Sequence, residues 1–257
     1  MSPKKEELSD APEPTLRLLD PAEGVSKVLV ITAHPDDVDF GAGGTVARLT
    51  DAGVEVVYCL VTDGDAGGSD LSTTSDQRAE VRRAEQRAAA AVLGVAELHF
   101  LGHLDGGVTF SMGLRRDLAR MIRIVRPDRV LCQSPERNLD RIYASHPDHL
   151  AAGEAALAAV YPDARNPFAY PELLDAEGLE PHTVGEVWLM ASPEPNVAIE
   201  TTAVLSRKMA GLRCHASQVG DGAHLDELVT TWGRTVAKAA GLPKKRTAEA
   251  FRAVDTR

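Results

Sequence analysis

Short apolar runs recur along the chain, and polar or turn-forming residues separate them. The runs are rich in Val, Leu and Ile, a composition typical of strands that are buried on both faces of a parallel sheet. We predict five strands from them, at Val28–Ile31, Val54–Val61, Leu98–Leu101, Val130–Cys132 and Val187–Met190.

The segments between these runs carry helix formers and helix stop signals. Arg78–Leu93 is rich in Ala, Glu and Arg, and Gly94 follows it as a stop. Leu114–Val125 ends where a proline disfavours further helix. Three more helices are predicted: one through Val46, Leu49 and Thr50 with a stop at Gly53, one at His149–Val160, and one from Ala203 to His215.

Strands that alternate with helices predict an α/β fold, a Rossmann-like and mostly parallel doubly wound sheet. Ligands of such sheets bind beyond the carboxyl ends of the strands, so we expect the active site there. Polar motifs follow the first four predicted strands: His34 to Asp37, then Asp63, then Asp105, and last His146 to His149.

Length and composition indicate a single domain. Of the 257 residues, 44% are hydrophobic, enough for one substantial core. The proline-containing residues 1–22 are predicted to be a flexible tail, and 23–257 to form the domain. A net charge of -10 argues against a nucleic-acid partner. Since we find neither a secretory signal nor an apolar run of the ~18 residues that span a membrane, we expect a cytoplasmic protein.

Two motifs of similar composition carry the candidate chemistry: His34-Pro35-Asp36-Asp37 and His146-Pro147-Asp148-His149. Two histidines and one aspartate from them can bind zinc tetrahedrally and leave one position for water. One acid and one imidazole then remain beside the metal, as a base and an acid for hydrolysis. The pattern therefore predicts a zinc-dependent amide hydrolase. The three cysteines are too few and too scattered for a disulfide framework or a zinc cluster.

The chain resembles the PIG-L/LmbE-like zinc deacetylases, which remove acetyl groups from N-acetylglucosamine-type sugars. The likeness rests on both motifs and on weaker blocks, and runs from about Val25 to Phe251. One position departs from the family pattern, because Val38 stands where many members carry Glu. We expect this change to alter the support of the loop without abolishing activity. The opening motif of the family continues through Phe40–Thr45, and the weaker blocks are Thr62–Gly64, Val81–Glu85 with Leu93–Val95, Leu101–Gly106, His215–Gln218 and Ala248–Phe251.

The resemblance implies a role for each motif residue. One Zn²⁺ per chain, or another divalent metal, is expected on His34, Asp37 and His149. Asp36 is expected to be the general base, with protonated His146 stabilising the oxyanion. The expected substrate contacts are Arg82, Asp105 and His215, and the expected orienting acids behind the histidines are Asp148 or Asp140.

Other interpretations stay open at this level. The substrate is expected to be a small acetamido sugar or glycoconjugate, with no membrane partner and with a homo-oligomer possible. One alternative is an amidase acting on conjugates of a glucosamine-containing thiol; another is a metal-containing sugar-binding protein without turnover. The glycines of Gly41–Thr45 follow the strand too late for a dinucleotide fingerprint, so we expect them to allow close helix packing. The proline-rich connection 161–182 is either a lid or a packed surface loop.

Overall fold

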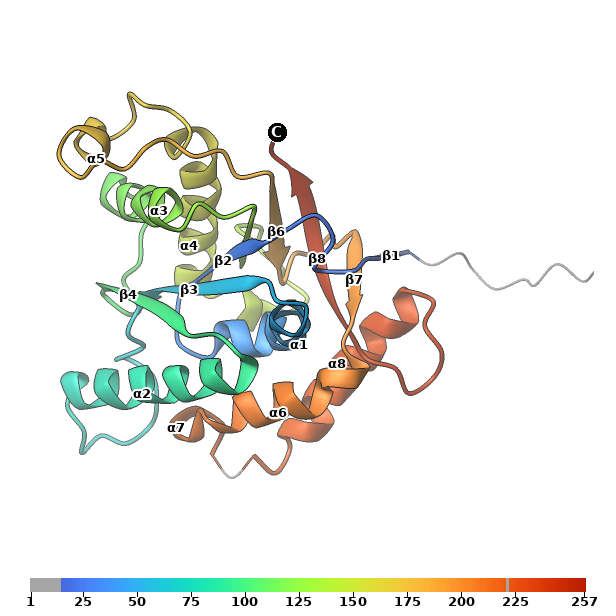
Figure 1. Ribbon diagram of the computed structural model, residues 1–257. Helices are drawn as coiled ribbons and strands as arrows, with labels where there is room; N and C mark the ends of the chain where they lie inside the picture. The colour runs from blue at the N-terminus through green and yellow to red at the C-terminus, as the bar shows by residue number, and fades with distance from the viewer. Residues whose placement is uncertain (1–14, 221) are drawn as a thin grey trace, which may run out of the picture.

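The computed structural model describes residues 15–220 and 222–257. Their strands form one eight-stranded sheet in the order β1-β7-β8-β6-β5-β2-β3-β4 (Figure 1). Strands β2 to β6 pair with one another in parallel, whereas β8 runs antiparallel to both β6 and β7. The strands are β1 Arg17–Leu18, β2 Lys27–Thr32, β3 Glu55–Thr62, β4 Glu97–His103, β5 Arg129–Gln133, β6 Glu186–Met190, β7 Val197–Glu200 and β8 Ala248–Asp255.

Helices cover both faces of the sheet. Helices α3 and α4 pack against one face of the sheet and form one hydrophobic core cluster with it. Helices α1 and α2 pack against the other face and form a second cluster (Figure 1). The doubly wound α/β fold predicted from the sequence is thereby confirmed. The helices are α1 Asp37–Asp51, α2 Ser75–Leu93, α3 Met112–Val125, α4 Pro147–Ala158, α5 Pro171–Asp175, α6 Leu205–Arg213, α7 Ala216–Val219 and α8 Leu225–Ala239, with shorter helical turns η1 Ile142–Ser145, η2 Ala159–Asp163 and η3 Thr202–Val204.

The five predicted strands are present as β2 to β6 with small changes at their ends. The sequence patterns missed β7, β8 and α8. Strand β8 is mostly buried at its start and exposed at its end, and it includes the charged residues Glu249 and Arg252, so it lacks the continuous apolar run of a parallel strand. Strand β7 has only 4 residues, too short for a clear period.

The predicted boundary of the tail at residue 22 is wrong in part. Residues 1–14 lie outside the described residues. Residues 15–22 belong to the domain, because Arg17 and Leu18 pair in parallel with β7 and the side chain of Leu16 is buried. The proline content suggested that this segment is a flexible tail, but pairing with β7 fixes it in the domain.

The glycines after the first motif lie inside α1 and allow it to approach its neighbours closely. A Cβ at Gly41 would lie 2.9 Å from Met190 of β6, and one at Gly44 would lie 2.6 Å from Thr201. Real Cβ atoms do not approach other atoms so closely, so a side chain at Gly44 would displace Thr201, and one at Gly41 would push aside the flexible side chain of Met190. The expected packing role of this segment is therefore supported.

The connection 161–182 is packed against α3. The buried guanidinium of Arg123 donates hydrogen bonds to the carbonyls of Asp163, Ala164, Asn166 and Ala169. These contacts favour the packed loop over the lid. Within the described ranges, no helix combines the length and the apolar composition needed to cross a membrane.

Candidate active site

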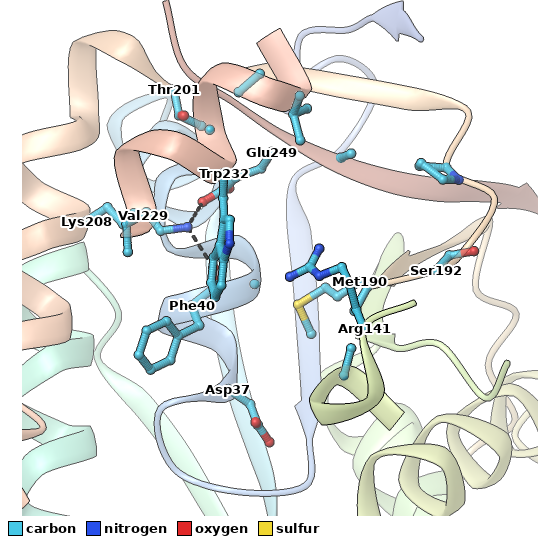
Figure 2. Close-up of a pocket in the computed structure, with 18 of the residues that line it drawn as sticks. Asp37, Phe40, Arg141, Met190, Ser192, Thr201, Lys208, Val229, Trp232 and Glu249 are labelled. Atoms are coloured by element: carbon cyan, nitrogen blue, oxygen red, sulfur yellow. Dashed lines mark hydrogen bonds and ion pairs between the residues drawn. The ribbon is translucent and has the colours of Figure 1, made fainter. Parts of the chain in front are cut away.

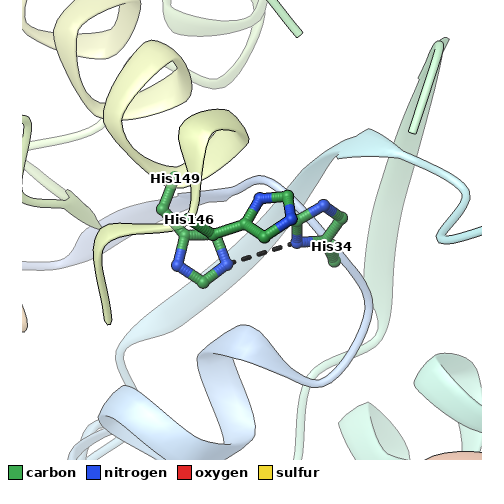
Figure 3. A group of neighbouring side chains, drawn as sticks. All are labelled: His34, His146 and His149. Carbon is green, nitrogen blue, oxygen red and sulfur yellow. Dashed lines mark hydrogen bonds between the residues drawn. The ribbon is translucent and has the colours of Figure 1, made fainter. Parts of the chain in front are cut away.

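Two turns at the carboxyl edge of the sheet carry the motif residues. The first follows β2 and leads into α1, with His34 after the strand and Asp37 at the start of the helix. The second precedes α4, which has His146 at its N-cap and His149 in its first turn. Because β2 and β5 are parallel neighbours, both turns emerge at the same edge. Figure 3 shows the three imidazoles gathered there.

Asp36 has an unusual backbone conformation. Its φ is 87°, in the left-handed region that L-residues rarely adopt. Two hydrogen bonds hold this turn: His34 N donates to Asp37 Oδ2 (2.7 Å), and Asp36 N donates to Gln86 Oε1 (2.8 Å). The two adjacent carboxylates meet different partners as a result. Asp37 faces the histidines and Asp36 faces Arg82.

Three side chains form a compact triangle at this edge, in which Asp37 presents a different carboxylate oxygen to each imidazole. His34 Nδ1 lies 3.3 Å from His149 Nε2 and 3.4 Å from Asp37 Oδ2, and His149 Nε2 lies 3.1 Å from Asp37 Oδ1. In tetrahedral coordination at 2.0–2.1 Å, two ligand atoms are about 3.3–3.4 Å apart. The three side chains thus have the spacing of ligands on one ion, and the site can hold a metal. His146 also brings a nitrogen within 4.8 Å of the other two histidines.

The second nitrogen of His34 is held by acidic residues. His34 Nε2 lies 3.0 Å from Asp105 Oδ1 and 3.3 Å from Asp148 Oδ2. Asp148 is buried and also accepts hydrogen bonds from the backbone of Gly106 and Val108. Acceptors of this kind fix the tautomer and the orientation of a metal-binding imidazole.

These contacts bear on two predictions. Asp148 has the position expected of an orienting acid, whereas Asp140 is exposed. Asp105 was predicted to contact the substrate, but its carboxylate bonds His34 and the backbone N–H of Ala66. The structure therefore places the Asp105 carboxylate behind His34, a candidate metal ligand.

The close packing of acids and imidazoles shifts their pKa values. Burial lowers the pKa of His34, but hydrogen bonds and charge interactions with Asp105 and Asp37 outweigh it and raise the pKa to about 10. Burial opposes ionisation of Asp37, yet His149 and His34 together hold its pKa well below the usual value. The pKa of His149 is raised by Asp37 against the effect of burial. The metal-free site therefore binds protons where a metal would bind.

Asp36 differs from its neighbour in its electrostatics. Burial and the charge of Asp37 raise its pKa to about 7, although Arg82 and His215 act in the opposite direction. Arg82 is only 5% exposed; Nη2 donates to Asp36 Oδ2 (2.9 Å) and to Pro35 O (2.6 Å). Arg82 was predicted to contact sugar hydroxyls. The observed contacts make it a support for the carboxylate of Asp36.

A buried network behind the turn was missed by the sequence patterns. Gln86 accepts from Asp36 N and donates to Asp39 Oδ2 (2.9 Å), and His215 Nε2 lies 2.9 Å from the same oxygen. Gln86, Asp39 and His215 are all 0% exposed. The ring of His215 is enclosed beneath α1, and this burial does not support the predicted contact with substrate. No local spacing links residues so far apart in the chain.

A pocket opens beside the triangle, and Asp37 and His149 are part of its wall. Figure 2 shows side chains that line this pocket. Its volume is about 500 Å³. Phe40 of α1, Met190 of β6 and Trp232 of α8 line it, so elements from both halves of the chain meet around it. The fold and the site together indicate a Rossmann-like α/β enzyme in which His and Asp side chains that can hold a metal lie beside the pocket.

Comparison with known proteins identifies the family. The profile of the PIG-L family, described as GlcNAc-PI de-N-acetylase, matches residues 29–160. A diacetylchitobiose deacetylase from Thermococcus kodakarensis is 34% identical over 93% of this chain and 86% of the relative. A 1D-myo-inositol 2-acetamido-2-deoxy-alpha-D-glucopyranoside deacetylase from Rhodococcus erythropolis is 29% identical over 75% of this chain and 81% of the relative. The chain belongs to the PIG-L family.

Solved structures agree with this assignment. The N,N'-diacetylchitobiose deacetylase from Pyrococcus horikoshii superposes with a TM-score of 0.84 at 31% identity, covering 92% of this chain and 86% of that one. The predicted family and fold are confirmed, and the predicted deacetylase class agrees with the names of the relatives. Val38, the departure from the family pattern, is fully buried in α1.

Proposed function

We propose that this protein is a zinc-dependent hydrolase that removes the N-acetyl group from an N-acetylglucosamine-type sugar or glycoconjugate and releases acetate. The observation that carries the proposal is the triangle of His34 Nδ1, His149 Nε2 and Asp37, with edges of 3.1–3.4 Å. Membership in a family whose similar relatives are named acetamido-sugar deacetylases supports the choice of substrate class.

The donor set supports zinc as the resident metal. Two imidazole nitrogens and one carboxylate at tetrahedral spacing are ligands that Zn²⁺ prefers, and three protein ligands leave a position open, as in catalytic sites. Asp105 and Asp148 keep the proton of His34 on Nε2, so that Nδ1 presents its lone pair to the ion. When bound, the metal supplies a Lewis acid that polarises a carbonyl and lowers the pKa of a water to about 7.

Asp36 is the proposed general base. A pKa of about 7 matches a base that must both accept and return a proton near neutral pH. One carboxylate oxygen, Oδ2, is held by Arg82, and that bond fixes the direction of the other. Asp36 takes a proton from the attacking water and can deliver it to the departing amine, so that one side chain serves both steps.

His146 is proposed to stabilise the oxyanion through a hydrogen bond. Its Nδ1 accepts from the backbone N–H of Asp148 (3.2 Å), so the neutral ring carries its proton on Nε2. Burial, and then the charges of His34 and His149, lower its pKa. A positively charged His146, as predicted from the family resemblance, is therefore not supported for the metal-free site, but the neutral ring can donate from Nε2.

The test is a panel of acetamido sugars incubated with the zinc-loaded enzyme, with acetate and free amine measured together. Equal amounts of acetate and amine are expected. Cleavage of a glucosamine-containing thiol conjugate without acetate release would point to the amidase alternative. Stoichiometric zinc without turnover of any substrate would point to a binding protein.

A further inference from the structure

A second hollow lies at the carboxyl end of α8, next to the turn that leads from this helix into β8 (Figure 1). Its volume is about 390 Å³, and five of its seven lining residues are cationic. We call it the basic hollow; it is lined by Arg234, Lys238, Leu242, Pro243, Lys244, Lys245 and Arg246. None of these lining residues is acidic, so positive charge dominates the hollow.

The basic hollow and the pocket beside the candidate metal site lie on opposite faces of α8. Trp232 and Val236 line the pocket, whereas Arg234 and Lys238 line the hollow. An α-helix turns by about 100° per residue, so side chains two residues apart point about 200° apart. The basic hollow is therefore a separate site, and a ligand in it does not reach the candidate metal ligands.

Most of the cations in the hollow have no acidic partner. Arg246 Nη1 donates a hydrogen bond to Glu200 Oε1 (3.1 Å). For the other four cations, no carboxylate of residues 15–220 or 222–257 lies within ion-pair distance. Arg234 and Lys238 are four residues apart on one face of α8, where two like charges repel each other. An anion in the hollow would relieve this repulsion.

The needs of the fold account for only part of this charge. The dipole of α8 favours a cation in its last turn, which explains Lys238. Lys244, Lys245 and Arg246 follow the end of the helix, and the dipole effect falls off within the last turn. Lys245 also has a φ of 73° inside a turn closed by a hydrogen bond from Arg246 N to Pro243 O (3.2 Å). Glycine or asparagine suits that backbone, so a lysine there is unfavourable for the turn and contributes a charge instead.

The size and the charge of the hollow favour a small anion over an extended one. A volume of about 390 Å³ falls in the ~300–1,000 Å³ range of small-molecule sites. Removing its five cations from the 28 Lys and Arg leaves 23 against 38 Asp and Glu, a net charge of -15. An extended polyanion such as DNA would also meet this acidic remainder of the surface, whereas a small anion contacts only the hollow.

We propose that the basic hollow binds a small anion that carries two or more phosphate groups. A single phosphate carries a charge of about -1.5 to -2, which neutralises at most about half of the four unpaired cations. Lysine binds phosphate as a point charge and arginine binds it as a bidentate fork, and the hollow offers both. Free diphosphate and a diphosphate carried by an organic molecule share this chemistry. The proposal depends neither on deacetylation nor on a bound metal.

The test is calorimetric titration of the full chain with inorganic diphosphate, inorganic phosphate and adenosine diphosphate at one ionic strength. We expect one diphosphate per chain, bound about tenfold more tightly than phosphate and less tightly as salt is added. Tighter binding of adenosine diphosphate than of inorganic diphosphate would indicate an organic carrier, and the reverse order a free anion. Equal binding of phosphate and diphosphate would overturn the proposal, as would tighter binding of duplex DNA or of vesicles that contain anionic lipid.

Lys244→Gln and Lys245→Gly locate the site. Each removes one cation and is expected to weaken diphosphate binding about threefold to tenfold. Because glycine suits the backbone at position 245, Lys245→Gly should keep or raise Tm while the affinity falls, which a purely structural role of this lysine cannot produce. Arg87→Gln is the matched control, since it removes an exposed cation of α2 outside the hollow and should leave the affinity unchanged. Diphosphate bound at the candidate metal site would be insensitive to all three substitutions, so unchanged affinity in both lysine variants refutes the proposal.

Discussion

Replacing Gln86 by Leu is expected to reduce turnover although Gln86 contacts neither the candidate metal site nor the pocket. Its side chain is 0% exposed and makes two bonds, from Asp36 N at 2.8 Å and to Asp39 Oδ2 at 2.9 Å. Leu has a similar size but can make neither bond. The substitution therefore leaves a part-buried N–H without its acceptor and a buried carboxylate with one donor fewer.

The magnitude follows from these two bonds. A buried group without a partner costs about 1–3 kcal/mol, and a bond to a charged group is worth about 1.5–3 kcal/mol, so the total destabilisation is about 2.5–6 kcal/mol. The left-handed backbone of Asp36 adds about 1–2 kcal/mol of strain that the Gln86 bond helps to offset. Once the turn relaxes, the carboxylate of Asp36 is displaced, and a displacement of about 1 Å can lower the rate about 10²-fold.

The assay measures kcat, KM, zinc content and denaturant unfolding for Gln86→Leu. We expect kcat to fall about 10–100-fold with KM changed less than about threefold. Gln77→Leu is the matched control, because Gln77 lies on the same helix, is exposed, and only completes the capping box with Thr74. It should lose about 1 kcal/mol and no activity. A Gln86→Leu enzyme with full zinc, reduced stability and kcat within twofold of wild type would refute the positioning role.

Three further predictions concern the metal and the electrostatics. Asp37→Ala should lose zinc, whereas Asp36→Ala should keep zinc and lose about 10²–10⁴-fold in kcat; the opposite zinc contents would exchange the two roles. Chelation of the metal should abolish activity and lower Tm, since a ligand bound only to the folded state stabilises it; an unchanged Tm in a differential scan would contradict this. Although burial raises it, hydrogen bonds from Ser26 and Lys27 hold the pKa of Asp128 below its usual value. That stabilisation is present above the unfolded pKa of about 4 and is lost as pH falls through the folded pKa. Because the carboxylate is partly exposed and screened by solvent, Asp128→Asn should cost about 1 kcal/mol at pH 7 and less at pH 3 in urea unfolding. A cost independent of pH would disprove this prediction.

The candidate ligands could be predicted because they are local features. His34 and Asp37 share one turn, and His146 and His149 share the first turn of α4, so each pair is close in sequence and in space. Their meeting follows from the parallel arrangement of β2 and β5, whose carboxyl ends lie at the same edge. A short motif after each of two such strands is therefore enough to predict a shared site.

The supporting residues could not be predicted with the same success. Arg82 and Asp105 were identified as important, but as substrate contacts, while the structure joins them to Asp36 and His34. Two residues that form a long-range hydrogen bond have no characteristic spacing in the sequence, and each looks like an ordinary polar residue of a helix or a turn. His215 shows the same difficulty, because its partner Asp39 is 176 residues away.

The sequence alone determined the alternation of buried strands and helices, and with it the edge at which the chemistry gathers. Those features depend on the local spacing of hydrophobic residues and on turn residues, and both can be recognised within a short segment of the sequence. Tertiary packing decided the rest: which nitrogen of His34 faces the metal position, how Gln86 holds Asp36, and where α8 spans a cavity. Each of these depends on segments brought together by the closure of β7 and β8 onto the sheet or by the packing of α2 and α6 against α1. Burial and hydrogen bonding between distant segments, and not propensity, therefore set the geometry of the site.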